Sequence, residues 1–225
     1  MTYRFPDRAT AGRLLAGQLR RYARRPDVLV LALPRGGVPV AFEIAQALDA
    51  QLDVMVVRKL GVPGYEELAL GAVAPGGVRV INEEIVRELA ISAARIEAIA
   101  ARQQAELARR EQGYRGDRPP AEITGRTVIL VDDGLATGSS MHAAVAAVRQ
   151  RSPARIVVAV PVVAIESCEA FQPAVDEIVW LLAPEPFYSV GMWYVDFRPT
   201  TDEEVRALLW RRQAHGARQL HHSCA

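Results

Sequence analysis

VILVDDGLATGSS, residues 128–140, joins an apolar run to two adjacent carboxylates, Asp132 and Asp133, and then to a series of small residues. A short continuous apolar run such as residues 128–131 is typical of a strand that is buried on both faces of a sheet. The small residues from Ala136 to Ser140 lead into a helical pattern, so unpaired amides, hydroxyls and the positive end of a helix dipole meet at one turn. The stretch therefore predicts a strand, an anion-binding turn and a helix, in that order.

The rest of the chain repeats this alternation of strand and helix. Apolar runs predict strands at residues 28–33, 52–57, 78–82, 126–131, 154–163 and 177–183. Helical spacing and capping residues predict helices at residues 10–24, 38–49, 92–112, 139–151 and 164–172, and another from Thr201 onward. Because strands that alternate with helices need crossover connections, we predict an α/β fold of three layers, in which a mainly parallel sheet is flanked by helices.

Two regions depart from the alternation. Residues 61–77 are rich in Gly and Pro and have no hydrophobic period, so they predict a long loop, of the kind that often carries function. Residues 215–225, HGARQLHHSCA, follow the last helical pattern and are expected to form a frayed tail.

Composition and charge exclude several classes of protein. The 225 residues carry a formal net charge of +1, so no overall field attracts the chain to nucleic acid or to a membrane surface. Two cysteines, Cys168 and Cys224, are too few for a disulfide framework and suit a reducing compartment. No apolar stretch approaches the roughly 20 residues of a membrane span, and the N-terminus lacks the apolar core of a secretion signal. We therefore expect a globular protein of the cytoplasm, without a nucleic acid or membrane partner.

The acid pair narrows the kind of ligand that the turn would bind. Two carboxylates repel a phosphate, so Asp132 and Asp133 would instead accept hydrogen bonds from sugar hydroxyls or hold a hydrated divalent cation. A phosphate at the turn together with hydroxyls at the acid pair describes a sugar phosphate. The alternative is an ordinary strand-to-helix turn in which Asp and Gly serve conformation and capping.

Three short motifs, in the same order along the chain, resemble those of the type I phosphoribosyltransferases. VILVDDGLATGSS is similar to the family's signature for phosphoribosyl pyrophosphate (PRPP), LPRGG at residues 33–37 to its pyrophosphate loop, and VVRKLG at residues 56–61 to its Arg-Lys segment. The start of the chain, Asp7-Arg8 followed by AGRLLA at residues 11–16, is similar to bacterial phosphoribosyltransferase-domain proteins of unassigned substrate. The resemblance implies one domain, residues 1–225, with a core at about residues 26–183 and a small hood from about residues 1–25 and 184–215.

The resemblance also implies a role for each motif residue. The catalytic residues would be Arg35, Arg58, Lys59, Asp132 and Asp133; the 5′-phosphate would lie on Ala136, Thr137, Gly138, Ser139 and Ser140; and the pyrophosphate would lie on Arg35, Gly36 and Gly37. Asp132 and Asp133 would bind the ribose hydroxyls and hold Mg²⁺, through water. The resemblance further implies a cis peptide bond between Pro34 and Arg35. The expected loop at residues 61–77 would be mobile without ligand and would close during turnover.

The aromatic segment GMWYVDF, residues 191–197, allows two interpretations. Trp193, Tyr194 and Phe197 could bind the acceptor base, because aromatic rings stack on nucleobases. Alternatively, the segment is an edge strand that packs the hood onto the core. Two motif positions also depart from the family pattern: Ala136 stands where hypoxanthine-type members have Asp, which argues against a 6-oxopurine substrate, and Ser139 stands where many members have Gly.

These motifs imply an enzyme that moves ribose 5-phosphate between PRPP and a nitrogenous base, with pyrophosphate as the other product and Mg²⁺ as cofactor. The alternative is a non-catalytic protein of the same fold that senses PRPP or a nucleotide. Arg35, Arg58 and Lys59 favour catalysis, because a sensor has no leaving group to stabilise. A Rossmann-type enzyme is disfavoured, since no G-x-G-x-x-G follows the first strand. The acceptor base and the oligomeric state stay open, with a homodimer among the arrangements that the resemblance allows.

Overall fold

A computed structural model describes residues 3–62 and 65–222 and contains the predicted parallel sheet. In this part of the chain a five-stranded sheet has the order β2-β1-β6-β7-β8, and every neighbouring pair is parallel. Its strands are β1 (Val28–Ala32), β2 (Gln51–Val54), β6 (Thr127–Val131), β7 (Arg155–Val162) and β8 (Glu177–Leu182). Each strand lies within the apolar run that predicted it, except that β2 begins one residue earlier, because these runs are buried between two helical layers.

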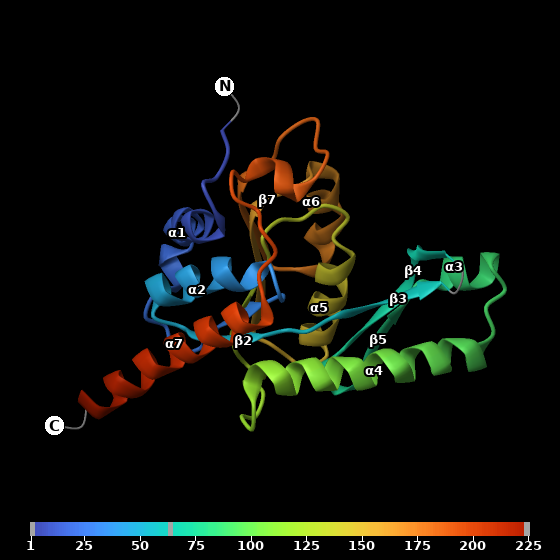
Figure 1. Ribbon diagram of the computed structural model, residues 1–225, viewed down its shortest axis with the longest axis horizontal. Helices are drawn as coiled ribbons and strands as arrows, with labels where there is room; N and C mark the ends of the chain where they lie inside the picture. Colours follow the sequence, from blue (N-terminus) through green and yellow to red (C-terminus); the bar gives the residue numbers. More distant parts are fainter. Residues whose placement is uncertain (1–2, 63–64, 223–225) are drawn as a thin grey trace.

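Helices cover both faces of this sheet, so the predicted three-layer α/β fold is confirmed (Figure 1). Along β1, Val28 and Val30 pack with α1 (Arg8–Gln18) and α2 (Gly37–Leu48), whereas Leu29 and Leu31 pack on the other face with α5 (Ser139–Arg149) and α6 (Ile165–Phe171). Short 3₁₀ turns, η1 (Arg20–Tyr22) and η3 (Gln172–Ala174), follow α1 and α6. Successive strand residues point to opposite faces, which is why one apolar run supplies both halves of the core.

The prediction of a long loop at residues 61–77 is wrong. Outside residues 63–64, which lie beyond the described residues, this region forms an antiparallel sheet with the order β3-β4-β5. The strands are β3 (Arg58–Val62), β4 (Tyr65–Ala74) and β5 (Val78–Ile81), with the 3₁₀ turn η2 (Pro75–Gly77) before β5. Gly71 pairs with Ile81 of the neighbouring strand, and the two backbones approach so closely that a Cβ on Gly71 would lie 3.1 Å from the Cα of Ile81. The glycine marks a close approach of two backbones and not a loop.

The helices α3 (Glu83–Glu88) and α4 (Ala93–Arg115) complete an arm that extends to one side of the five-stranded sheet (Figure 1). The predicted N-cap of α4 is confirmed, since the Ser92 hydroxyl accepts a hydrogen bond from the amide of Arg95. Leu60 and Leu70 of the antiparallel sheet pack in the same core as Ala100 and Leu107 of α4. The arm therefore has its own apolar layer, which is continuous with the main core.

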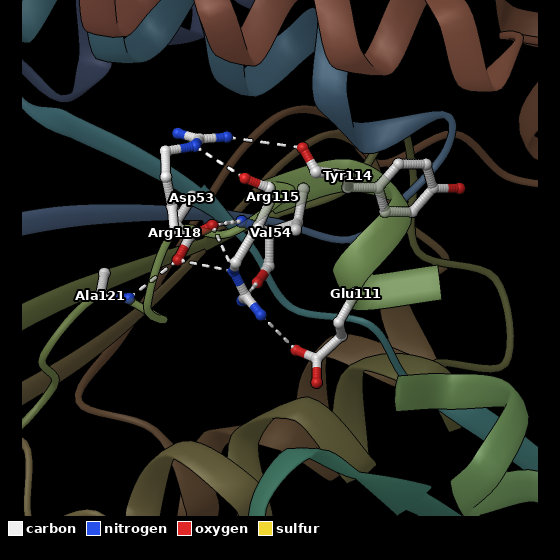
Figure 2. A network of polar contacts seen from close by, with 7 residues as sticks. All are labelled: Asp53, Val54, Glu111, Tyr114, Arg115, Arg118 and Ala121. Atoms are coloured by element: carbon white, nitrogen blue, oxygen red, sulfur yellow. Dashed lines mark hydrogen bonds and ion pairs between the residues drawn. The ribbon is translucent and has the colours of Figure 1, made fainter. Parts of the chain in front are cut away.

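A buried polar network fixes the end of α4 to β2 (Figure 2). Arg115 donates hydrogen bonds to the Asp53 carboxylate at 2.9 Å and to the carbonyl oxygen of Val54 at 2.6 Å, and it pairs with Glu111 at 2.6 Å. The second carboxylate oxygen of Asp53 accepts the amide of Ala121 at 2.9 Å. A buried ion pair is tolerated when further hydrogen bonds satisfy its remaining atoms, as here.

The first described residues of the chain lie beside residues 193–195. The amide of Phe5 donates to the carbonyl of Trp193 at 2.8 Å, and the amide of Val195 donates to the carbonyl of Phe5 at 2.8 Å. Phe5 and Tyr194 are fully buried, with ring centroids 5.5 Å apart. The strand part of the second interpretation of residues 191–197 is wrong, because the 3₁₀ turn η4 (Val190–Trp193) and a single bridge between Phe5 and Tyr194 take the place of a strand. The packing part is confirmed, since Tyr194 is buried in one cluster with Phe5 and Val162 of β7.

The last helix, α7 (Asp202–His222), begins as predicted and ends later than predicted. Thr201 and Glu204 form a capping box: each side chain accepts the other's amide, at 3.1 and 2.7 Å. The expected frayed tail is wrong up to His222, where the helix ends, and residues 223–225 lie beyond the described residues. Across the ranges that the structure describes, no helix combines the length and the apolar character needed to cross a membrane.

Candidate functional site

The acid pair lies at the carboxyl end of β6, where the sheet positions it beside the end of β1. The register pairs Ala32 with Val131, so the residues that follow the two strands meet at one edge of the sheet. The side chain of Asp132 accepts the amide of Asp133 at 2.8 Å. Burial and the neighbouring charge of Asp133 raise the pKa of Asp132 well above its ordinary value. Two adjacent carboxylates in this position favour a ligand that brings hydrogen-bond donors or positive charge.

The five residues predicted to bind a phosphate form one turn at the start of α5. Gly138 caps this helix with a φ of 71°, which favours glycine, and a Cβ there would overlap the ring of Phe171, at 3.0 Å from Cζ and closer to a second ring carbon. The hydroxyl oxygens of Thr137 and Ser139 are 3.3 Å apart and exposed. The hydroxyl of Ser167, in α6, donates to the carbonyl of Ala136 and so ties the turn to the next helix. The turn presents free amides and hydroxyls, as an anion site requires.

The glycine loop after β1 lies directly against the acid pair. The peptide bond between Pro34 and Arg35 is cis, as the resemblance implied. A Cβ on Gly36 would lie 2.7 Å from the carboxylate carbon of Asp133, and a Cβ on Gly37 would lie 2.9 Å from the Cα of Asp132. Both positions thus need glycine for lack of space. The two motifs, about 100 residues apart in the sequence, form one surface.

Arg35 points from this loop toward the start of α7. Its Nη1 lies 4.0 Å from a carboxylate oxygen of Asp202, and the same oxygen accepts the Tyr114 hydroxyl at 2.7 Å. About half of the Arg35 side chain is exposed. Burial, followed by the bond to Asp202, raises the pKa of Tyr114 to about 12, so this hydroxyl keeps its proton near neutral pH. Arg35 is loosely held and can turn toward an anion at the loop.

Arg58 and Lys59 lie at the start of β3, and the structure directs them differently. Arg58 donates from Nε and Nη2 to the side-chain oxygen of Gln103 in α4, at 3.0 and 2.9 Å. Burial lowers the pKa of Arg58, and the charge of Arg110 lowers it further. Lys59 is exposed and, as the next strand residue, points to the opposite face. In its described contacts Arg58 thus binds α4 and not the acid pair.

Sequence reasoning missed one residue at the acid pair, Arg8. Its Nε donates to Oδ2 of Asp133 at 2.8 Å, and its Nη1 donates to the carbonyl of Arg198 at 2.8 Å. The guanidinium carbon lies 3.9 Å from the ring centroid of Phe197. Burial raises the pKa of Asp133, and the hydrogen bond and the charge of Arg8 oppose part of this increase. The available signal was the N-cap Asp7, whose carboxylate accepts the amide of Thr10 at 2.6 Å and sets Arg8 as the first helical residue.

The three aromatic candidates differ in their surroundings. Tyr194 is fully buried, and its hydroxyl donates to the carbonyl oxygen of Asp133 at 2.6 Å. Phe197 is half-buried and covered by the Arg8 guanidinium. Trp193 is also half-buried, and its indole nitrogen has no hydrogen-bond partner among the described residues. Tyr194 therefore contacts the acid pair through the backbone of Asp133, and neither face of its buried ring is open to a ligand.

A family model described as a phosphoribosyl transferase domain matches residues 3–172. The chain belongs to this family. Two proteins of Mycobacterium tuberculosis, from strains CDC 1551 and H37Rv, are named provisionally as phosphoribosyl transferases and are 45% identical to it over 207 residues, which is 92% of this chain and 46% of theirs. The phosphoribosyl transferase chain therefore spans about half the length of these curated relatives.

Solved structures agree with the phosphoribosyl transferase fold. A crystal structure of a Thermus thermophilus protein is 47% identical, with a TM-score of 0.80, and the match covers 92% of this chain and 97% of that one. A Neisseria gonorrhoeae protein with bound ppGpp is 14% identical, with a TM-score of 0.51, and the match covers 93% of this chain and 94% of that one. The second likeness shows the fold alone.

The residues at the acid pair fit a magnesium ion that is shared with a phosphate-bearing ligand. No group of three or more His, Cys, Asp or Glu side chains placed to hold a metal occurs within residues 3–62 and 65–222. The oxygen donors that the acid pair offers are the two carboxylates of Asp132 and Asp133. Mg²⁺ prefers oxygen ligands, keeps several waters and is commonly shared between one or two carboxylates and substrate phosphates. This donor set suits that arrangement and not a metal cage built from protein alone.

Proposed function

We propose that the protein transfers ribose 5-phosphate between PRPP and a nitrogenous base, with pyrophosphate as the other product. One observation carries the proposal: the carboxylate of Asp133 packs against Gly36 of the glycine loop, while the hydroxyl-lined turn starts three residues after it. Two anion sites thus flank one acid pair at the carboxyl edge of a parallel sheet. PRPP has the matching order of charges, with a phosphate at one end, a pyrophosphate at the other and hydroxyls between them.

The reaction places a different demand on each part of the site. The bond between the sugar C1 and the pyrophosphate oxygen breaks, a bond from C1 to a base nitrogen forms, and the electron pair leaves with pyrophosphate. Residues 136–140 would hold the 5′-phosphate in both states, whereas Arg35 and the amides of Gly36 and Gly37 would stabilise the charge that grows on pyrophosphate. Asp132 and Asp133 would bind the ribose hydroxyls. A magnesium ion held through water at the pair would neutralise pyrophosphate charge.

The side chains predicted to assist the leaving group take different parts in this proposal. Lys59 is exposed and follows Arg58 in the strand, so it would act from the face away from α4, apart from the Arg58 contact. Arg58 would have to leave Gln103 before it could act. This arrangement favours one alternative, a PRPP or nucleotide sensor of the same fold, because a sensor needs the phosphate turn but no leaving-group residue.

The terminal segments would form the hood over the acceptor. In this arrangement residues 26–183 are the core, and residues 1–25 and 184–215 form the hood of one domain. The half-buried rings of Trp193 and Phe197 are candidates to contact a base, while Tyr194 acts through the backbone of Asp133. Ala136 cannot exchange a proton with the base, which argues against a 6-oxopurine acceptor.

The test is to incubate the full chain with Mg²⁺, PRPP and a panel of bases and to follow pyrophosphate release. Release with at least one base, lost in Asp133→Asn, supports the transferase. Calorimetry with Mg²⁺ and PRPP provides the second measurement. Tight PRPP binding without pyrophosphate release for any base would favour the sensor over the transferase. No PRPP binding at millimolar concentration would contradict both proposed functions.

A further inference from the structure

Arg8 is held at the acid pair by contacts on all sides. Its Nε bonds to Asp133, its Nη1 bonds to the Arg198 carbonyl, and its guanidinium lies over Phe197. Only 11% of the Arg8 side chain and 15% of the Asp133 side chain are exposed. An arginine with this many fixed contacts has given up most of its rotamer freedom, so its position is built into the fold.

The position of Arg8 fixes the orientation of the Asp133 carboxylate. Oδ2 of Asp133 accepts from Arg8, and the same oxygen is the Asp133 atom nearest to the position of a Cβ on Gly36. The hydroxyl of Tyr194 holds the backbone carbonyl of Asp133 at 2.6 Å. Arg8 and Tyr194 come from opposite ends of the chain, and both therefore converge on the residue that would bind ribose.

Arg8 also changes the charge that a ligand meets. Among the ion pairs of the described residues, the pair between Arg8 and Asp133 is the one that includes a member of the acid pair. One unit of negative charge is thus compensated before any ligand arrives. A free divalent cation gains less at this pair than at two uncompensated carboxylates, because a positive guanidinium already lies at hydrogen-bond distance.

We propose that Arg8 is a resident counter-ion of the acid pair and a positioning residue for Asp133, and that its guanidinium is the group that keeps a bare divalent ion from binding at the pair. The inference rests on the proposed function in that it assigns the acid pair to a metal and ribose. A metal complex of PRPP brings its own anchors, the 5′-phosphate at residues 136–140 and the pyrophosphate at the glycine loop, and these offset the repulsion by Arg8. A bare ion has no such anchors.

The test measures binding of Mn²⁺ alone, as MnCl₂, to the full chain without PRPP, from the loss of the free-ion electron paramagnetic resonance signal. The proteins are wild type, Arg8→Gln, Arg8→Lys and Arg8→Gln combined with Asp133→Asn. Arg13→Gln is the matched control, because Arg13 lies on the same helix and pairs with Glu43, away from the acid pair. Wild type, Arg13→Gln and Arg8→Lys should bind Mn²⁺ weakly. Arg8→Gln should bind it about tenfold more tightly or better, and the added Asp133→Asn should abolish the gain.

The sign of the change separates a counter-ion from a merely structural contact. Loss of packing would weaken or leave unchanged the affinity for Mn²⁺, whereas loss of a counter-ion strengthens it. Equal affinity of Arg8→Gln and wild type, or a gain that survives Asp133→Asn, would overturn the inference. If Arg8→Gln fails to fold, wild type decides alone: micromolar Mn²⁺ binding that disappears in Asp133→Asn would overturn it, and weak binding that tightens when PRPP is added would support it. Because the main assay contains no PRPP, a failure of PRPP binding would remove the proposed function without deciding the role of Arg8.

Discussion

Replacing Gly36 by alanine would insert a methyl group where the Asp133 carboxylate now lies. The new Cβ would be 2.7 Å from the carboxylate carbon, whereas two carbon atoms in contact are normally about 3.5–4.0 Å apart. The carboxylate must therefore move by about 1 Å. The backbone is not the obstacle, because Gly36 has an ordinary helical φ of −60°. The cost of the substitution falls on the contacts of Asp133.

A shift of this size would disrupt the hydrogen bond between Arg8 and Asp133, now 2.8 Å, because Oδ2, which accepts from Arg8, is the Asp133 atom nearest the new methyl group. Loss of a hydrogen bond between charged, largely buried groups costs about 1.5–3 kcal/mol. For a chain of this size that corresponds to a fall in Tm of about 3–12 °C. The displaced carboxylate should also weaken PRPP binding by about tenfold or more, measured by calorimetry.

Gly17→Ala is the matched control, because no atom lies within 4 Å of a Cβ at that position in α1. It should raise the free energy of unfolding by about 0.5–1 kcal/mol, since alanine favours a helix more than glycine does. If Gly36→Ala melts and binds PRPP like wild type, the site has room for a methyl group. Such a result would refute the inference that Gly36 and Arg8 together hold the Asp133 carboxylate in place.

Two further pairs of substitutions test other parts of the structure. Asp53→Asn should lower the free energy of unfolding, measured in urea, by about 3 kcal/mol, because the buried Arg115 loses its charged partner. Glu97→Gln, which removes the exposed ion pair with Arg79, should have a far smaller effect. Similar effects of the two substitutions would contradict the stabilising role of the buried network. Arg35→Ala should lower kcat more than PRPP affinity, whereas Thr137→Ala should mainly weaken PRPP binding, by about 1–2 kcal/mol, since the 5′-phosphate contact is the same in both states. Steady-state kinetics with an active base would decide this, and a change in PRPP affinity alone for Arg35→Ala would end its catalytic assignment.

The parallel sheet could be predicted from the sequence because its signals are local. Each strand is a short apolar run that the two helical layers bury, and each loop motif follows its strand directly. The cis bond at Arg35 was expected from the family resemblance. The adjacency of the two motifs followed because the carboxyl ends of neighbouring parallel strands meet.

The errors arose where long-range contacts decide the structure. Gly71 is a loop signal in isolation, but it lies in a strand because the backbone of Ile81 approaches it. Arg8 could not be assigned because its partner, Asp133, lies 125 residues away. The sequence left Tyr194 open between stacking on a base and packing the hood, and only the fold shows that its hydroxyl donates to a backbone carbonyl at the acid pair. Each of these roles depends on a neighbour that no spacing pattern in the sequence specifies.

The network around Asp53 and Arg115 has a consequence for how the chain can vary. The two residues are 62 positions apart, and the antiparallel sheet with α3 and α4 lies between them. Their contact closes this segment at its base, next to β2. The entropy of closing a loop grows slowly with its length, by about 0.6 kcal/mol for each doubling. Insertions or deletions in the outer part of the arm should therefore cost the five-stranded sheet little, as long as Asp53 and Arg115 are kept.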